Sequence, residues 1–416
     1  MSAGADEPAS ELVTDCLIAG GGPAGMMLGL LLARAGVDVI VLEKHADFLR
    51  DFRGDTIHPS TLDVMDELGL GDDFFKLPHD EVRQLSAVAA GVSTPVGDFT
   101  HVPSRRKMLV FMPQWEFLDF LAARARRYRA FRLLMQAEAI DLIRKDNRVV
   151  GLLVKMADGV KPIRAALIVA ADGRHSTVRA RSGLEAIEFG APMDVLWMRL
   201  TRRSDDPGQA LGYLGTRKVL VMLGRGSYWQ CGLIIPKGSY AEIQRRGLEA
   251  FQQDVRACAP FLGDRVRELD DWDAIKLLTV QVDRLRKWSR DGLLCIGDAA
   301  HAMSPIGGVG INLAIQDAVA AANLLWRSFR RGSPSPRDLQ RVQARRSYPT
   351  VMTQALQLAI QKFAIERLFK GGPITSMPLL LRALKAWPVL RRIPARIVGV
   401  GFRPEHVRSP DAHKNA

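Results

Sequence analysis

The stretch from Thr14 to Glu43 most constrains the fold of this chain, because it reads as a strand, a glycine-rich turn, a helix and a second strand. Its glycines, Gly20, Gly22 and Gly25, have the spacing G-x-G-x-x-G. In such a turn the first glycine permits a tight bend, the second lets the backbone approach a pyrophosphate, and the third allows close packing of helix on strand. The pattern predicts a βαβ unit that binds a dinucleotide.

Two other residues of the stretch agree with this interpretation. Pro23 falls in the first turn of the predicted helix, where proline is tolerated. Glu43 closes the second strand, where an acidic side chain holds a ribose hydroxyl, while the N–H groups at the start of the helix bind phosphate. The stretch alone fits NAD or FAD, and a glycine-rich turn without a ligand is the alternative.

Composition excludes several classes of protein. With 416 residues, 47% of them hydrophobic, the chain is long enough for two domains with substantial cores. The net charge of +13 is spread over both expected domains without a nucleic-acid motif, so we expect no nucleic-acid partner and a basic surface that attracts anionic cofactors. The four cysteines lack C-x-x-C spacing, which favours a reduced, cytoplasmic protein without metal.

The start of the sequence does not predict a signal peptide, and the segment from Leu379 allows two interpretations. Residues 1–13 read as a disordered acidic leader without the apolar core of a signal peptide, and no apolar run approaches the length that spans a bilayer. From Leu379 the chain mixes apolar residues with arginines. Such a segment either lies on a membrane surface, which suits a lipophilic substrate, or packs as a helix on the nucleotide-binding domain with its arginines in water.

The remaining pattern predicts an α/β fold in which a Rossmann-like domain is interrupted by a mainly antiparallel sheet. We expect a discontinuous nucleotide-binding domain made of residues 14–80, 105–183 and 284–330. The substrate domain is expected to consist of residues 81–104 and 184–283. A C-terminal helical region is expected over residues 331–416. One helix, at 240–257, is expected within the substrate domain. After Pro336 the chain is expected to be helical as far as Gly371 and irregular beyond it.

A second glycine-rich motif follows the predicted strand that begins at Gly292. Asp298 stands where the chain leaves the sheet, and Gly307, Gly308 and Gly310 open the next helix. Asp298 is suited to accept a hydrogen bond from a ribitol or ribose hydroxyl, and the backbone over 308–312 to donate N–H groups to a flavin ring or a phosphate. A simple strand-to-helix loop is the alternative.

Three motifs, in this order along the chain, resemble the class A flavoprotein monooxygenases, the para-hydroxybenzoate hydroxylase superfamily: the glycine-rich turn of Gly20 to Gly25, the dipeptide Asp172-Gly173, and Gly297-Asp298 with the glycine-rich stretch from Pro305 to Asn312. The resemblance frames the chain to about residue 330. It implies noncovalent FAD, with the pyrophosphate on Gly22 to Gly25, the adenosine ribose on Glu43 and the ribitol near Asp298. It also implies NAD(P)H that docks transiently, in agreement with the lack of a second Rossmann pattern.

The resemblance implies further cofactor-binding positions, which are Gly20, Pro23, Ala24, Lys44, Arg53, Gln114, Asp172, Pro305, Gly308, Val309, Gly310, Ile311 and Asn312. Arg53 matches an arginine that contacts the flavin chain, and Gln114 matches a flavin-contacting glutamine. The carbonyl of Pro305 and the amides after it would lie beside the isoalloxazine. Family members use the motif that contains Asp172 to bind FAD and the passing NAD(P)H. The alternative is that Asp172-Gly173 is only a turn that ends a strand.

The chemistry implied by the resemblance belongs to the cofactor. NAD(P)H reduces FAD, O2 adds to give a C4a-hydroperoxide, and one oxygen passes to an aromatic substrate such as a phenol, a quinolone or a polyketide-like molecule. The protein supplies position, exclusion of water and a base. His58 is a candidate for that base, with a structural loop histidine as the alternative.

The substrate-facing wall in family members is the inserted sheet. Its candidates here are Tyr213, Met222, Tyr228 and Trp229, of which strand alternation lets about half face inward. We expect a small aromatic or lipophilic substrate, O2, and a monomer or homodimer.

Two other functions fit the same motifs. One is another flavoenzyme of this fold, such as a prenyl-chain reductase or a halogenase, although the halogenase pattern W-x-W-x-I-P is replaced by YWQCGLIIP over 228–236. The other is a protein that binds FAD without turnover.

Overall fold

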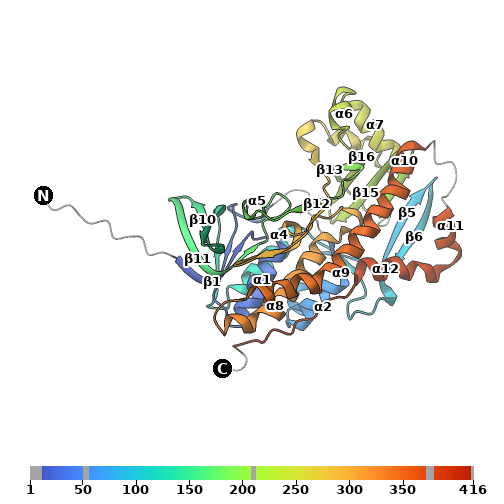
Figure 1. Cartoon of the computed structure of the whole chain (residues 1–416). Helices are drawn as coiled ribbons and strands as arrows, with labels where there is room; N and C mark the ends of the chain where they lie inside the picture. The colour runs from blue at the N-terminus through green and yellow to red at the C-terminus, as the bar shows by residue number, and fades with distance from the viewer. Residues whose placement is uncertain (1–11, 50–55, 208–211, 372–378, 414–416) are drawn as a thin grey trace.

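The computed structural model describes residues 12–49, 56–207, 212–371 and 379–413. Two large sheets are joined by helices, and the long helix α9 (Pro336–Ile360) runs from the side of the first sheet towards the second (Figure 1). The predicted disordered leader lies outside the described residues, except that Leu12 and Val13 already belong to the first strand. Arg53 also lies outside them.

The first sheet has the strand order β19-β20-β11-β1-β2-β8, with β10 and β9 continuing from β11. Its parallel strands are β1 (Leu12–Ala19), β2 (Val39–Leu42), β8 (Phe131–Leu134), β11 (Gly159–Ala170) and β20 (Leu293–Cys295). Antiparallel strands complete it, namely β9 (Glu138–Lys145), β10 (Arg148–Met156) and β19 (Ser289–Arg290). The parallel strands are short apolar runs, as expected for strands covered by helices.

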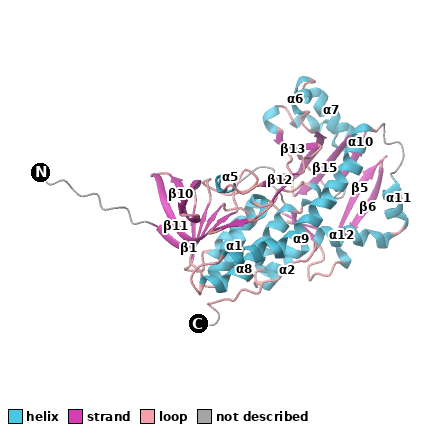
Figure 2. Cartoon of the chain, viewed as in Figure 1, coloured by secondary structure: helices cyan, strands magenta, loops and turns pink. Residues whose placement is uncertain are grey.

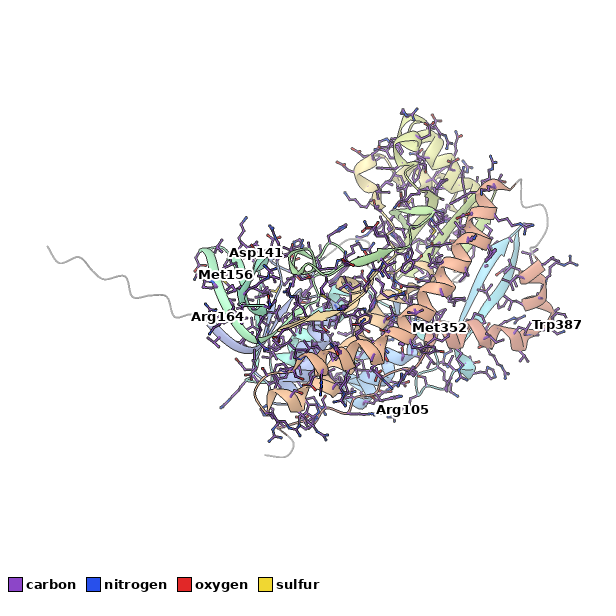
Figure 3. All side chains as sticks on the ribbon, viewed as in Figure 1. Arg105, Asp141, Met156, Arg164, Met352 and Trp387 are labelled. Atoms are coloured by element: carbon purple, nitrogen blue, oxygen red, sulfur yellow. The ribbon has the colours of Figure 1, made fainter. Side chains whose placement is uncertain are left out.

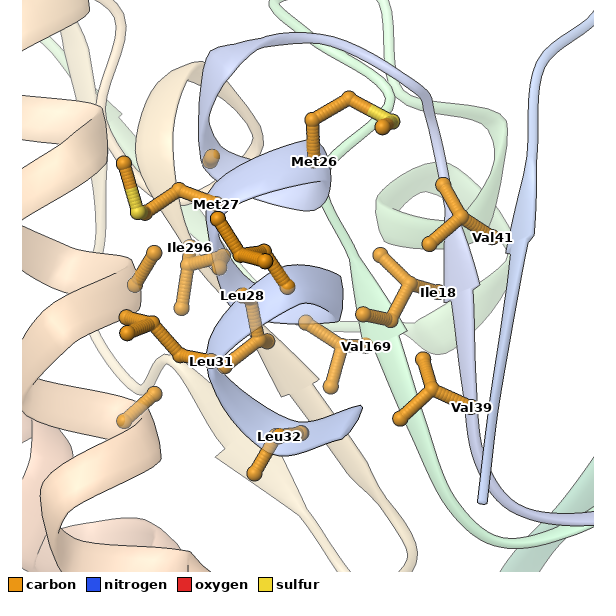
Figure 4. Close-up of a cluster of buried hydrophobic side chains, with 14 of the residues drawn as sticks. Ile18, Met26, Met27, Leu28, Leu31, Leu32, Val39, Val41, Val169 and Ile296 are labelled. Atoms are coloured by element: carbon orange, nitrogen blue, oxygen red, sulfur yellow. The ribbon is translucent and has the colours of Figure 1, made fainter. Parts of the chain in front are cut away.

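Helix α1 (Pro23–Arg34) fills the space between this sheet and helix α8 (Gly310–Phe329). Figure 4 shows Met27, Leu28 and Leu31 of α1 among side chains from the strands and from Ile296. Ten of the twelve residues of α1 are buried, so the helix is held by packing on both sides. Helix α4 (Gln114–Ala125) also packs against α1.

The second sheet joins distant parts of the chain (Figure 2). In order, its strands are β17 (Lys276–Leu278), β13 (Met193–Thr201), β16 (Tyr228–Pro236), β15 (Lys218–Arg225), β14 (Gly212–Gly215), β5 (Gln84–Ala89) and β6 (Val92–Asp98). All neighbours are antiparallel except β14 and β5. The domain limits stay a prediction, since membership of a sheet does not delimit a folding unit.

Smaller elements connect the two sheets. These are β3 (Thr56–Ile57), α2 (Pro59–Glu67), α3 (Gly71–Phe74), β4 (Asp80–Val82), β7 (Leu109–Phe111), α5 (Thr177–Ser182), β12 (Ala186–Glu188) and β18 (Asp283–Leu285). The single helix expected at 240–257 is wrong, because the structure has α6 (Tyr240–Arg245) and α7 (Leu248–Cys258). Gly247, with φ +88°, separates them.

The expectation of an irregular chain beyond Gly371 is also wrong. After a π-helical turn (Gln361–Ile365) and α10 (Glu366–Lys370), the chain forms α11 (Leu379–Ala386), a 3-10 turn η7 (Pro388–Arg391) and α12 (Arg392–Gly399). Both α11 and α12 pack on β6 of the second sheet rather than on the nucleotide-binding sheet. Helices this short have little stability of their own and depend on such packing.

Among the residues that the structure describes, one helical stretch, Ile306–Phe329, is long and apolar enough to cross a membrane by length and composition alone. This corrects the expectation that no apolar run approaches that length. In the fold 67% of its apolar window is buried, as in the core helix of a globular domain.

Candidate active site

The three motifs meet at the carboxyl end of β1. A Cβ atom on Gly20 would lie 2.4 Å from the carbonyl oxygen of Ala171, which places the first motif directly against the second. A Cβ atom on Gly297 would lie 3.2 Å from the Cβ of Ala24, which places the third motif against the first turn of α1. The carboxyl ends of parallel strands are where ligands bind in α/β sheets.

The glycines of the first motif answer different structural demands. Gly20 has φ +104°, and a Cβ atom on Gly25 would lie 1.9 Å from the carbonyl oxygen of Gly20. Around Gly22, by contrast, a Cβ atom would meet nothing within 4 Å. Packing therefore requires glycine at two of the positions, while at Gly22 the open space matches the predicted approach of a pyrophosphate.

The N-termini of α1 and α8 both lack a side-chain cap and an acidic residue in the first turn. Helix N-termini present unpaired N–H groups and a partial positive charge, which suit phosphate. Pro23 and Ala24 lie in the first turn of α1, while Gly310, Ile311 and Asn312 lie in that of α8. These two uncapped ends fit an anionic dinucleotide such as FAD.

Glu43 lies immediately after β2 and is 9% exposed. Its Oε2 accepts a hydrogen bond from the N–H of Gly21 at 3.2 Å, and its Oε1 accepts from the N–H of His45 at 3.1 Å. The carboxylate is thus fixed beside the glycine turn, where the ribose is predicted. Lys44, the next residue, is exposed.

Asp298 lies in the turn after β20, with Arg174 as its neighbour. The Nη2 of Arg174 is 3.5 Å from Oδ2 of Asp298, and the Asp298 side chain is 31% exposed. A partly exposed carboxylate at this edge is suited to a ribitol hydroxyl. Gln114 is the first residue of α4.

Asp172 is engaged by the protein itself. Ser176 Oγ donates a hydrogen bond to its Oδ1, and the N–H of Val178 donates to its Oδ2 at 3.2 Å. Burial raises the pKa of Asp172, against the opposing effect of these hydrogen bonds. The carboxylate therefore stabilises the turn before α5, and its role towards FAD stays a prediction. Arg179 is bound to Asp283 at 3.0 Å.

We call residues 305–312 the flavin loop. Gly307 and Gly308 have φ of +79° and +62°, and the N–H of Gly308 donates to the carbonyl of Pro305 at 3.0 Å. Val309 precedes α8 as its N-cap. The loop thus turns sharply at its two consecutive glycines before the helix begins.

The side chain of Asn312 ties this loop to the segment 56–61. Its Oδ1 accepts hydrogen bonds from the His58 N–H at 2.9 Å and from the Thr61 hydroxyl at 2.7 Å. Its Nδ2 donates to the carbonyl of Thr56 at 3.0 Å. The side chain of Asn312 therefore holds the loop, and a role of this residue towards FAD stays a prediction.

His58 is fully buried beside the flavin loop. Its Nδ1 lies 2.6 Å from the carbonyl oxygen of Val398, so Nδ1 carries the hydrogen and Nε2 keeps its lone pair. Among the described residues Nε2 has no hydrogen-bond partner, and a Cβ atom on Gly308 would lie 3.8 Å from it. Burial lowers the pKa of His58 to about 4, although the hydrogen bond to Val398 acts in the opposite direction.

A buried charged group that the sequence did not predict holds the third motif. Oδ2 of Asp317 accepts hydrogen bonds from the Gly297 N–H at 3.0 Å and from Nε2 of His301 at 2.6 Å, while Oδ1 accepts from Nε of Arg346 at 2.9 Å. Burial alone would raise the pKa of Asp317, but His301 and Arg346 hold it below its ordinary value. The available signal was Gln316-Asp317, a polar pair inside an apolar helical run.

Glutamines of α9 hold the start of the flavin loop and the residues just before it. The Nε2 of Gln357 donates to the carbonyls of Ser304 at 2.9 Å and Ile306 at 2.8 Å, and Nε2 of Gln354 donates to the carbonyl of Ala302 at 3.1 Å. Gln361, one turn beyond Gln357, is also buried, yet neither atom of its amide has a partner among the described residues.

The second sheet turns one face towards the flavin loop. Ile306 packs in a cluster that includes Val219, Ile234 and Trp197. The Trp197 ring covers Gly232, where a Cβ atom would lie 3.0 Å from the ring. Within the described residues the indole N–H of Trp197 is buried without an acceptor.

The residues named for the substrate wall divide between the two faces. Tyr213, Met222 and Trp229 pack with α7 in the core on the opposite side of the sheet. Tyr228 has the guanidinium of Arg199 5.1 Å from its ring centre. Strand alternation predicted that about half of these four side chains would face the active site. Trp197, on the face of the sheet towards the flavin loop, was not predicted, because alternation alone does not say which face of a sheet is turned to the active site.

Residues 13–355 match a protein family described as FAD binding domain, and the chain belongs to this family. It is 34% identical over 355 residues to 6-methylpretetramide 4-monooxygenase of Streptomyces rimosus, and this alignment covers 84% of each chain. It is 27% identical to rifampicin monooxygenase of Rhodococcus hoagii, over 76% of this chain and 64% of that relative. A crystal structure of pqsL, a probable FAD-dependent monooxygenase from Pseudomonas aeruginosa, has a TM-score of 0.73 at 20% identity, over 86% of this chain and 99% of that one.

These matches confirm the α/β fold with an FAD-binding domain and the class of enzyme predicted from the motifs. The chain is a flavin-dependent monooxygenase.

Proposed function

We propose that this monooxygenase takes electrons from NADH or NADPH and hydroxylates an aromatic small molecule through a C4a-hydroperoxyflavin. The observation that carries the proposal is the meeting of three motifs between two uncapped helix N-termini. FAD bound there supplies the activation of O2. The residues of this chain bind it, orient it and exclude water around the substrate.

The predicted cofactor positions fall into groups around this site. The pyrophosphate would lie on 22–25 and the ribose on Glu43 beside Lys44. The ribitol would lie near Asp298, with Asp172 behind the glycine turn, and the flavin ring along 305–312. Gln114, together with Arg53 outside the described residues, completes the proposed set.

Polar groups without partners support a substrate that carries oxygen substituents. The amide of Gln361, the indole N–H of Trp197 and Nε2 of His58 are buried without hydrogen bonds in the described structure. Leaving such a group unpaired costs about 1–3 kcal/mol, so hydroxyl or carbonyl groups of a bound substrate would offset that cost. Phenolic, quinolone and polyketide-like molecules carry such groups, and the names of the two curated relatives support the polyketide-like class.

The setting of the enzyme belongs to the same proposal. The cysteines Cys16, Cys231, Cys258 and Cys295 are buried as free thiols, which suits the cytoplasmic location predicted from the sequence. A monomer or a homodimer stays a prediction.

Stopped-flow spectroscopy on the purified holoenzyme tests the proposal. We expect NADH or NADPH to bleach the bound FAD without oxygen, faster when a suitable phenol is present, and O2 to restore the oxidised spectrum. Failure of both nucleotides to reduce the flavin, with and without a panel of phenols, would defeat it. That result would instead indicate a protein that binds FAD without turnover.

A further inference from the structure

The elements α11, η7 and α12 form a projecting end of the molecule next to β5 and β6 (Figure 1). Their outer surface carries Trp387, Val389 and Ile393 together with Lys385, Arg392 and Arg396, and we call these six residues the cationic face. The exposed fractions of its apolar members are 63%, 64% and 57%, respectively. Trp387 stands at the far edge of the molecule (Figure 3).

The cationic face belongs to a fixed part of the fold. On the inner side, Leu381 and Leu384 of α11 pack against Ala89. Ala395 of α12 is completely buried, and a Cβ atom on Gly399 would lie 3.0 Å from the ring of Phe99. Each helix therefore buries one apolar side and leaves a second apolar side in water, which packing within the chain does not explain.

Within α11, η7 and α12 themselves the charges are of one sign, while Asp98 at the end of β6 lies close enough to Arg392 for their charges to interact. The sequence has no acidic residue between Glu366 and Glu405, whereas residues 379–399 contain five arginines and lysines. In the described part of the chain no carboxylate forms an ion pair with Lys385, Arg392 or Arg396. Elsewhere cations are commonly paired, as in Arg132–Asp38 at 2.7 Å.

We propose that the cationic face binds the surface of an anionic lipid bilayer. Apolar side chains flanked by lysine and arginine on a short helix are the pattern that inserts at the boundary between headgroups and acyl chains. Tryptophan favours this interface, and the long basic side chains reach the lipid phosphates while their stems cover apolar surface. A second copy meeting this face through its own cationic face would bring like charges together, which is unfavourable.

The same helix connects this surface with the active site. At the end of α12, the carbonyl of Val398 binds His58, and a Cβ atom on Gly307 would lie 3.7 Å from the Val398 side chain. A bilayer on the outer side of α12 would therefore lie one helix away from the flavin loop. A lipophilic substrate dissolved in the membrane would be concentrated near that entrance.

Vesicle flotation of the full-length holoenzyme tests the proposal. The probes are vesicles of phosphatidylcholine alone and of phosphatidylcholine with phosphatidylglycerol, each at low and at high salt. We expect flotation with the anionic vesicles at low salt and its loss at high salt, because surface attraction is screened within a Debye length of about 10 Å at 0.1 M salt.

Variants locate the binding surface. Arg392→Glu with Arg396→Glu should lower the vesicle partition coefficient at least about tenfold, and Trp387→Ser with Ile393→Ser should also abolish flotation. Val160→Asp, at an exposed position 54% accessible in the β10–β11 hairpin, is the control that should float normally. FAD content and circular dichroism verify that each variant is folded.

Three outcomes would overturn the proposal. The first is absence of flotation with anionic vesicles at low salt. The second is unchanged flotation of both cationic-face variants. The third is a dimer that light scattering detects at high salt, that dissociates in the variant Trp387→Ser with Ile393→Ser, and that accompanies a lack of vesicle binding by every protein tested. This result would assign the cationic face to contact with a second copy of the chain.

Discussion

Replacing the glycines of the first motif one at a time separates the glycine needed for packing from the glycine needed for the cofactor. Gly22 has φ −73° and ψ −176°, an extended conformation open to any residue, and a Cβ atom there meets nothing within 4 Å. Gly22→Ala should therefore leave the free energy of unfolding of the apoprotein unchanged or raise it by about 0.4–1 kcal/mol. The added methyl group lies where the pyrophosphate approaches, so FAD affinity should fall at least about tenfold, equivalent to about 1.4 kcal/mol.

Gly25→Ala should give the opposite result. Its Cβ atom would lie 1.9 Å from the carbonyl oxygen of Gly20, which forces the helix and the strand apart. We expect the apoprotein to lose about 1–3 kcal/mol or more, as in other overpacked cores. Gly97→Ala is the control, because its nearest contact of 3.6 Å is an ordinary van der Waals distance and it lies in the second sheet.

Urea unfolding of the three apoproteins, followed by circular dichroism, measures stability, and quenching of flavin fluorescence measures FAD affinity. Wild-type FAD affinity in Gly22→Ala would refute the assigned role of that glycine. A Gly25→Ala apoprotein as stable as wild type would refute the packing argument.

Three other changes test separate parts of the site. Asp298→Ala should give folded protein that purifies with much less FAD, and a normal flavin content in its absorption spectrum would show the assignment to be wrong. Because burial lowers the pKa of His58 from 6.5 to about 4, the unfolded state takes up its proton first, and stability is lost as the pH falls from about 6.5 towards 4. Between pH 7 and pH 5 the free energy of unfolding of the wild-type apoprotein, measured from its urea transition, should fall by about 2 kcal/mol more than that of His58→Gln. An equal fall in the two proteins would contradict this assignment. Asp317→Asn should cost about 3–5 kcal/mol in the same assay, because His301 and Arg346 lose their shared buried carboxylate and Arg346 keeps the longer contact with Glu405 at 3.6 Å. Asp38→Asn, from a surface pair, should cost about 1 kcal/mol at most, and similar losses for the two variants would contradict the difference in burial.

The features that the sequence predicted are those encoded within a short stretch. The turn at Gly20, Gly22 and Gly25 and the loop at Gly307 and Gly308 are local, since each depends on neighbouring residues and on backbone conformations that glycine permits. The order of the motifs then predicted the family, which the comparisons confirm.

Features that depend on distant partners were missed. Asp317 is held by Arg346, which follows it by 29 positions on another helix, and no periodicity links the two. The glutamines of α9 contact loops more than fifty positions away, at Ala302 and Ser304. The helices after Gly371 form because they pack on β6, a contact that local propensity does not contain.

The source of the oxygen atom in the product tests the central claim most directly. The holoenzyme is incubated with NADPH or NADH, isotopically labelled dioxygen and a panel of phenolic, quinolone and polyketide-like aromatics, and products are analysed by mass spectrometry, with labelled water in a parallel reaction. We predict a hydroxylated product that carries one oxygen atom from dioxygen and none from water. A hydroxylated product labelled from water would contradict the account.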